Sequence, residues 1–158
     1  MAVETVKVKA KQEAPIVVDA TNLIVGRMAS NVAKLLLNGH RVVIVNSEKA
    51  LVSGSRKNIV TKQLKRLEIG SVVNPKYNPH RYREPNKMLH RMIRGMIPRK
   101  KPSGIAAMKR LRAYIGTPES YKSVEKTVFE NAKATKPLPM YMTMGEVASA
   151  IGWKQGSK

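Results

Sequence analysis

The chain has 158 residues, enough for one domain with a real core, and that core must be aliphatic because 42% of the residues are hydrophobic but only 4% are aromatic. Its 30 lysines and arginines stand against 10 acidic residues, and the resulting net charge of +20 at pH 7 predicts a polyanionic partner. The absence of cysteine excludes disulfides, thiolate nucleophiles and cysteine-ligated zinc.

Residues 1–15 are expected to form a basic N-terminal tail. Valine alternates with lysine there, and the segment ends at Pro15. A segment of this composition stays mobile or becomes ordered on its partner. No apolar stretch in the chain approaches the roughly 20 residues of a membrane span, so we expect a soluble, cytoplasmic protein with no membrane partner.

The segment from residue 16 to residue 46 predicts a strand, a helix and a second strand. The β-branched sequence IVVDA begins it, and VVIVN at residues 42–46 ends it. Between them, apolar residues recur on one helical face, at Met28, Val32, Leu35 and Leu36. Gly39 offers this helix a stop. Such a βαβ unit pairs its strands in parallel through a right-handed crossover.

A short strand and a basic amphipathic helix are expected next. The sequence ALVSGS supplies the strand, and Ser55 can cap a helix that runs to about Glu68. The apolar face of this helix should point inward, at Ile59, Val60, Leu64 and Leu67. The opposite face is basic, at Lys62, Lys65 and Arg66.

Residues 70–87 combine prolines, tyrosines and cations, a composition typical of an extended loop. An apolar helical stripe follows, at Met88, Leu89, Met92, Ile93, Met96 and Ile97. Lys87, Arg91 and Arg94 face away from it, and Pro98 ends the helix. A basic amphipathic helix can also lie on a membrane surface, but this one lacks Trp and Phe, and its methionines suit a core.

Residues 99–104 predict a basic turn that leads into another short helix. This helix is expected to pack through Ile105, Met108 and Leu111. A final strand at residues 112–116 would then complete an α/β core over residues 16–116.

Residues 117–158 are expected to form a C-terminal extension. Its first part, residues 117–141, is proline-rich and should be peripheral or wrapped on a partner. The sequence TMGE, from Thr143 to Glu146, fits a capping box that opens a last short helix. Val147 and Ile151 would form its apolar side, and Gly152 its end.

Little in the sequence supports catalysis or nucleotide binding. The loop after the first strand has Gly26 alone, and no dinucleotide-binding or P-loop glycine pattern occurs. Asp19, the single aspartate, is better suited to a turn than to catalysis, and the three histidines lie at no metal-binding spacing. We therefore expect no enzyme, cofactor, metal or small-molecule substrate. The alternative is an RNA-acting enzyme or a nucleotide-dependent RNA-binding factor on the same βαβ unit.

A window without acidic residues contains half of the predicted RNA-binding residues. Nine lysines and arginines, and no acid, lie between Glu84 and Glu119. Unopposed cations in this number favour phosphate binding over a solvated surface. No DNA-binding motif is present, and the tyrosine-containing loop suits folded RNA. The predicted RNA-binding residues are Lys62, Lys65, Arg66, Lys76, Tyr77, His80, Arg81, Tyr82, Arg83, Lys87, Arg91, Arg94, Arg99, Lys100, Lys101, Lys109, Arg110 and Arg112.

Three segments resemble one known family. They are VVDATNLIVGRMASNVAKLLLNG, VNSEKALVSGS and RMIRGMIPRKKPSGIAAMKRLRAYIGTPE, which run in order from Val17 to Glu119. Together they resemble ribosomal protein thirteen of the large subunit, the L-thirteen family. The specific part is RGMIP with the downstream LRAYIG, and NPHRYREPNKMLHRMIRGMIP is similar to the archaeal and eukaryotic branch. The long further extension typical of eukaryotic members of this family is lacking at the C-terminus, which favours an archaeal-type member.

The resemblance implies a three-layer α/β/α fold with a small, mainly parallel sheet, accompanied by basic loops and extended terminal segments. It also implies a structural, non-catalytic constituent of the large ribosomal subunit. Such a protein binds large-subunit ribosomal RNA from early in assembly and meets neighbouring ribosomal proteins. The family's most specific segment falls on residues 94–98 and continues through Arg99, Lys100 and Lys101, the same basic turn that the charge pattern indicates.

Overall fold

The structure, a computed structural model, describes residues 14–154. The predicted tail therefore lies outside the described residues, except for its last two positions. The strands are β1 (Ile16–Asp19), β2 (Val42–Val45), β3 (Leu51–Ser53), β4 (Leu111–Ala113), β5 (Lys126–Thr127) and β6 (Tyr141–Thr143). The α-helices are α1 (Val25–Leu37), α2 (Arg56–Glu68), α3 (Pro85–Gly95), α4 (Pro102–Lys109) and α5 (Met144–Ala150). Short 3₁₀ helices are η1 (Ser47–Lys49), η2 (Pro75–Tyr77), η3 (Glu119–Tyr121), η4 (Glu130–Ala132) and η5 (Leu138–Met140).

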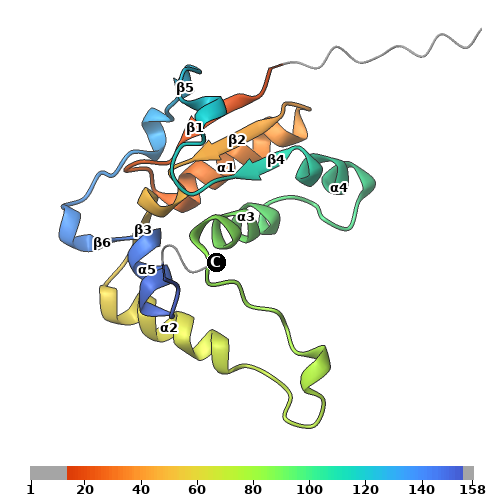
Figure 1. Cartoon of the computed structure of the whole chain (residues 1–158), viewed down its shortest axis with the longest axis vertical. Helices are drawn as coiled ribbons and strands as arrows, with labels where there is room; N and C mark the ends of the chain where they lie inside the picture. Colours follow the sequence, from red (N-terminus) through yellow and green to blue (C-terminus); the bar gives the residue numbers. More distant parts are fainter. Residues whose placement is uncertain (1–13, 155–158) are drawn as a thin grey trace, which may run out of the picture.

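The main sheet has four parallel strands in the order β4–β2–β1–β5 (Figure 1). Val17 lies opposite Val43 in the β1–β2 register. Every residue of β2 is buried, which explains its unbroken VVIV sequence, because a central parallel strand meets neighbours on both faces. The predicted βαβ unit and the α/β class with a mainly parallel sheet are confirmed.

The larger core lies on one face of this sheet, where Val18, Val42 and Ile44 meet α1 and α3. The predicted inner face of α1 is confirmed, since Met28, Val32 and Leu36 are fully buried and Leu35 packs against them. Gly39 follows α1 and ends it with a φ of 104°, a backbone conformation that residues other than glycine rarely adopt.

The other face of the sheet holds a smaller cluster of three valines, Val17, Val43 and Val45. Tyr114 and the η3 residue Tyr121 pack against these valines, with their ring centroids 6.1 Å apart. Two of the chain's few aromatic side chains thus cover the face away from α1.

Residues beyond 116 contribute more to the fold than the sequence suggests. β5 pairs with β1, and Ala132 is fully buried in the core cluster. β6 pairs with β3 in a second, antiparallel sheet. The expected peripheral position of residues 117–141 therefore needs correction. The strand expected at residues 112–116 is β4, which begins one residue earlier, at Leu111, and is not the final strand, because β5 and β6 follow it. The division into a tail, a core and an extension stays a prediction.

The capping box at the start of α5 is confirmed. Thr143 Oγ1 accepts from the Glu146 backbone N–H at 3.2 Å, and Glu146 Oε2 accepts from the Thr143 N–H at 3.3 Å. Val147 and Ile151 are buried, as predicted, and Gly152 ends the helix with φ of 90°.

Two predicted helix faces are wrong in part. Met96, expected inside, is 45% exposed because α3 ends at Gly95 and the chain turns there. Ile105 is 51% exposed, because α4 instead packs through Gly104 and Ala107. Both errors arise because helical spacing locates a face but not the neighbour that covers it.

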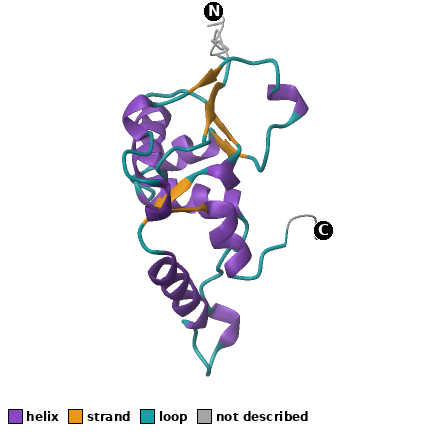
Figure 2. Ribbon diagram, turned by 90° about the vertical axis from the view of Figure 1, so that its left-hand side faces the viewer, coloured by secondary structure: helices purple, strands orange, loops and turns teal. Residues whose placement is uncertain are grey.

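α2 and residues 69–84 extend away from the two sheets as an arm (Figures 1 and 2). No residue of α2 is fully buried, and Leu64, predicted to point inward, is 41% exposed. Ile59, Val60 and Leu67 do pack against the core. Ser55 precedes the helix, but its side chain makes no capping hydrogen bond.

Candidate nucleic-acid interface

Three hollows adjoin α3, and neighbouring hollows share lining residues. The α2–α3 hollow has a volume of about 400 Å³, the α3–β4 hollow about 370 Å³ and the α3–α4 hollow about 400 Å³. Tyr82 and Arg91 line both of the first two, and Arg94 lines both of the last two. We call this continuous surface the basic stripe. Among the described residues that line it, none is an aspartate or a glutamate.

α3 fixes the geometry of the basic stripe. Leu89 and Ile93 are fully buried and anchor the helix in the core. Helical spacing then directs Lys87, Arg91 and Arg94 to the opposite side, as predicted from the sequence. The stripe is therefore preordered by the same packing that stabilises the fold.

The α3–β4 hollow brings His90 together with four cations. Lys87, Arg91 and Arg94 come from α3, and Arg112 comes from β4. Burial, followed by the charges of Arg94 and Arg112, lowers the pKa of His90 below its usual range, so the imidazole is neutral at pH 7. A neutral histidine can still donate a hydrogen bond to a phosphate oxygen.

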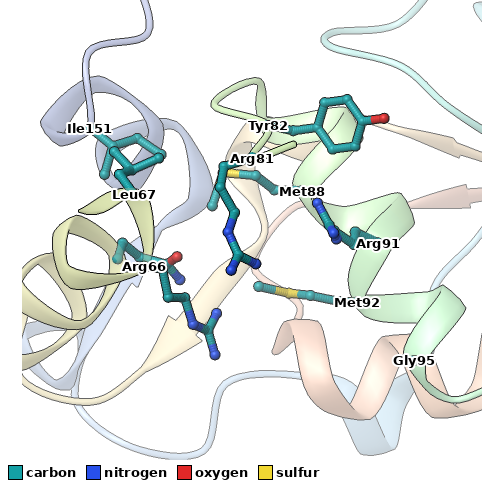
Figure 3. A pocket seen from close by; sticks show the side chains of 10 residues that line it. Arg66, Leu67, Arg81, Tyr82, Met88, Arg91, Met92, Gly95 and Ile151 are labelled. Atoms are coloured by element: carbon teal, nitrogen blue, oxygen red, sulfur yellow. The ribbon is translucent and has the colours of Figure 1, made fainter. Parts of the chain in front are cut away.

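The α2–α3 hollow is shared by the arm and the body. Figure 3 shows the guanidinium groups of Arg66 and Arg81 pointing into it from α2 and from the loop before α3. Arg91 and Met92 approach from α3, and Leu67 lies on the α2 side. Arg66 and Arg81 are distant in sequence, so their approach is a product of the fold.

The α3–α4 hollow includes part of the predicted basic turn. Arg94, Arg99 and Lys109 line it. α4 begins close to this turn because Gly104 has no side chain, and an added Cβ there would collide with the carbonyl oxygen of Pro98. Lys100 and Lys101 are exposed beside it.

Tyr82 sits between the first two hollows and is already surrounded by polar groups. Its ring makes an edge contact with His80, with the ring centroids 4.6 Å apart. Arg91 Cζ and Lys87 Nζ lie 5.7 and 5.9 Å from the ring centroid, within cation–π range. Arg91 also donates to the His80 carbonyl, which ties the loop to α3.

Carboxylates neutralise little of the basic stripe. Within the described part of the chain, Lys87 is the only predicted RNA-binding residue that forms an ion pair, with Glu84 at 2.7 Å. The other ion pairs recorded there, Lys122–Glu119 and Lys133–Glu130, involve residues outside the stripe.

The structure does not bring all the predicted residues together. Lys62, Lys65, Lys76 and Tyr77 are exposed on the arm, away from the three hollows. Arg83 reaches toward the end of α5, near Gly152. Arg110 Nη2 donates to the Leu36 carbonyl at 2.7 Å, which gives it a structural role at the C-terminus of α1.

Some residues of the basic stripe were not anticipated. Met88, Met92 and Leu67 supply apolar surface in the α2–α3 hollow, and His90 and Asn86 line the α3–β4 hollow. His90 lies three residues after Lys87 and four before Arg94, a helical spacing that could have placed it among the cations. No sequence signal pairs Leu67 with Met92.

The carboxylate of Asp19, the residue considered for an alternative active site, accepts three hydrogen bonds from nearby residues. Its Oδ1 accepts from the Thr21 N–H at 3.0 Å, the Thr21 hydroxyl at 2.7 Å and Asn46 Nδ2 at 3.0 Å. Burial alone would raise the pKa of Asp19, but these hydrogen bonds and nearby Lys126 outweigh it and lower the pKa. The carboxylate thus joins the turn after β1 to the end of β2, as the turn interpretation predicts.

No helix in the described part of the chain is both long enough and apolar enough to cross a membrane.

Comparison with known proteins identifies similar chains. Residues 13–120 match the family described as Ribosomal protein L13. The chain is 41% identical to the large ribosomal subunit protein uL13 of Aeropyrum pernix over 142 residues, covering 89% of this chain and 92% of the relative. It is 41% identical to uL13 of Methanococcoides burtonii, with 87% and 98% coverage, and 40% identical to uL13 of Sulfurisphaera tokodaii, with 87% and 94% coverage.

Proposed function

Because this chain belongs to the ribosomal protein L13 family, we propose that it is a structural, non-catalytic constituent of the large ribosomal subunit that binds ribosomal RNA through the basic stripe. Its relatives carry the name of a large-subunit protein. The observation that supports RNA as the direct partner is the run of three adjoining hollows lined by cations and by no carboxylate among the described residues. A surface of this kind meets several phosphates at once and releases their counterions.

We also propose that the chain joins its RNA early in assembly and later contacts neighbouring ribosomal proteins. The basic stripe is held by α3, which the protein's own core anchors. No other protein is needed to form it, so RNA can bind before the subunit is complete. The alternative of a nucleotide-dependent factor has less support, since Asp19 is engaged in the turn.

The salt dependence of RNA binding tests the proposal. For a protein that meets 6 to 10 phosphates, the affinity for a large-subunit ribosomal RNA fragment should fall roughly 10³- to 10⁵-fold between about 50 and 200 mM salt. Filter binding or fluorescence anisotropy would measure it. A nearly flat salt response, or failure of the protein to co-sediment with the large subunit, would contradict the proposal.

RNA binding is also expected to strengthen as the pH falls from about 7.5 to about 5.5. Burial, together with the charges of Arg94 and Arg112, lowers the pKa of His90 and keeps the free imidazole neutral. A phosphate bound beside the ring supplies a negative charge that stabilises the protonated imidazole. Binding therefore raises the pKa of His90 and takes up a proton, which by linkage favours the complex at lower pH.

His90→Gln supplies the comparison for this pH effect. Glutamine keeps a hydrogen-bond donor but does not titrate, and His40 and His80 remain in both proteins. The affinity of the variant should depend less on pH than that of the unmodified chain. Superimposable pH profiles would place the bound phosphate away from His90.

A further inference from the structure

The α2–α3 hollow differs in chemistry from the rest of the basic stripe. Its rim carries three guanidinium groups, those of Arg66, Arg81 and Arg91. Its walls are apolar, formed by Leu67 and Ile151 on one side and Met92 on the other (Figure 3). A phosphate alone needs no such walls, because apolar side chains add nothing to the binding of a small, strongly hydrated anion.

Arg81 provides a second indication of a ligand. Its Nε is buried and has no hydrogen-bond partner among the described residues. A buried donor of this kind costs free energy unless an acceptor satisfies it. The Nε is shielded from the hollow, so an acceptor that enters the hollow would bind the Nη groups, which point into it, and would reach the Nε only after a shift of the side chain.

The size and composition of the hollow fit one nucleotide. Its volume of about 400 Å³ falls in the range of sites that hold small organic ligands. Guanidinium groups bind phosphate oxygens and stack on bases, while methionine and leucine side chains pack against a base plane. Tyr82 is less suited to stack a base, because His80, Lys87 and Arg91 already surround its ring.

We propose that the α2–α3 hollow receives the base of one unpaired RNA nucleotide, held against Met92 and Leu67, while Arg66 and Arg81 hold its phosphate. The proposal rests on the proposed RNA-binding function and adds a recognition element to it. An unpaired base is required, because a base stacked inside a helix does not expose its faces to such a hollow.

A protein side chain is the less suitable occupant. The three cations of the rim would leave an apolar side chain surrounded by uncompensated positive charge, and no carboxylate among the described lining residues offsets it. A nucleotide supplies both the apolar surface and the negative charge. Its binding would also join the arm to the body, since Arg66 belongs to α2 and Met92 to α3.

The test uses the full chain with ¹³C-labelled methionine methyl groups, followed by nuclear magnetic resonance. The probes are a triadenylate RNA, the same trinucleotide without its central base, and inorganic phosphate. The Met92 methyl signal, assigned by its loss in Met92→Leu, should move upfield with triadenylate because of the ring current of the base. It should move much less with the abasic trinucleotide or with phosphate.

Matched variants separate the base from the phosphate. Met92→Gln keeps the size of the side chain but makes the wall polar, and it should weaken triadenylate binding about 3- to 10-fold while leaving abasic binding unchanged. Met92→Leu should bind both trinucleotides as the unmodified chain does. Arg81→Gln should weaken both.

Equal affinity for the two trinucleotides would reduce the hollow to a phosphate site and overturn the proposal. A Met92 signal that responds to none of the probes would also overturn it, and would favour a side chain of a neighbouring protein as the occupant. In either case steep salt-dependent binding of the ribosomal RNA fragment would show that the proposed function still holds. Loss of that binding would contradict both the nucleotide site and the proposed RNA-binding function.

Discussion

Replacing Ile93 by alanine is expected to lower the free energy of unfolding by about 2–5 kcal/mol. Ile93 is fully buried, and its side chain joins α3 to the core on the face of the sheet that α1 also covers. Alanine would remove this contact and leave a cavity that the surrounding side chains fill only in part. Urea unfolding followed by circular dichroism measures the change, provided that the slope of the transition stays constant.

Met96→Ala is the matched control for Ile93→Ala. The two residues belong to the same apolar stripe in the sequence, but Met96 is 45% exposed. Its replacement should cost about 1 kcal/mol or less. If the two variants lost equal stability, the position of α3 on the core would be wrong.

The double variant Arg94→Gln with Arg112→Gln is expected to lose roughly 100-fold in affinity for the ribosomal RNA fragment, since a hydrogen bond to a charged group contributes about 1.5–3 kcal/mol. Both residues line the α3–β4 hollow, and neither pairs with a carboxylate in the described part of the chain. The salt dependence should become shallower by about one to two units of slope, because fewer counterions are released. Fluorescence anisotropy at several salt concentrations gives both quantities.

Lys122→Gln with Lys133→Gln removes the same charge from outside the basic stripe. These lysines are paired with Glu119 and Glu130, at 3.8 and 3.2 Å. Their loss should change affinity only about threefold or less, since exposed charges that do not touch the RNA are screened by salt. Equal losses in the two double variants would mean that net charge, rather than the geometry of the basic stripe, governs binding. Thermal melting of both variants shows whether the fold is retained.

The βαβ unit was predictable because its signals are local. The apolar VVIV sequence and the apolar periodicity of α1 predict which of their residues are buried. β1 and β2 form the expected parallel pair. The capping box at Thr143 was equally local, since both of its partners lie within four residues. The cations of α3 could be placed on its exposed side for the same reason.

The C-terminal part of the fold was less predictable. β5 has only two residues and pairs with a strand more than a hundred positions earlier, so its sequence carries no readable alternation. The helix α4 likewise carries an apolar pattern, but a close approach between Gly104 and Pro98 turns Ile105 outward.

Composition and local spacing are enough to predict the α/β class, the order of the first elements, the large positive charge and the resemblance to the L13 family. The burial of individual apolar residues of α3, and the approach of cations from different elements, depend instead on how those elements pack against one another. Arg66, Arg81 and Arg91 come from α2, the arm loop and α3. They converge because Leu67 of α2 and Leu89 of α3 pack on the same core cluster. Helical periodicity reports which residues share a face, whereas the neighbour that covers this face is set by contacts between segments distant along the chain.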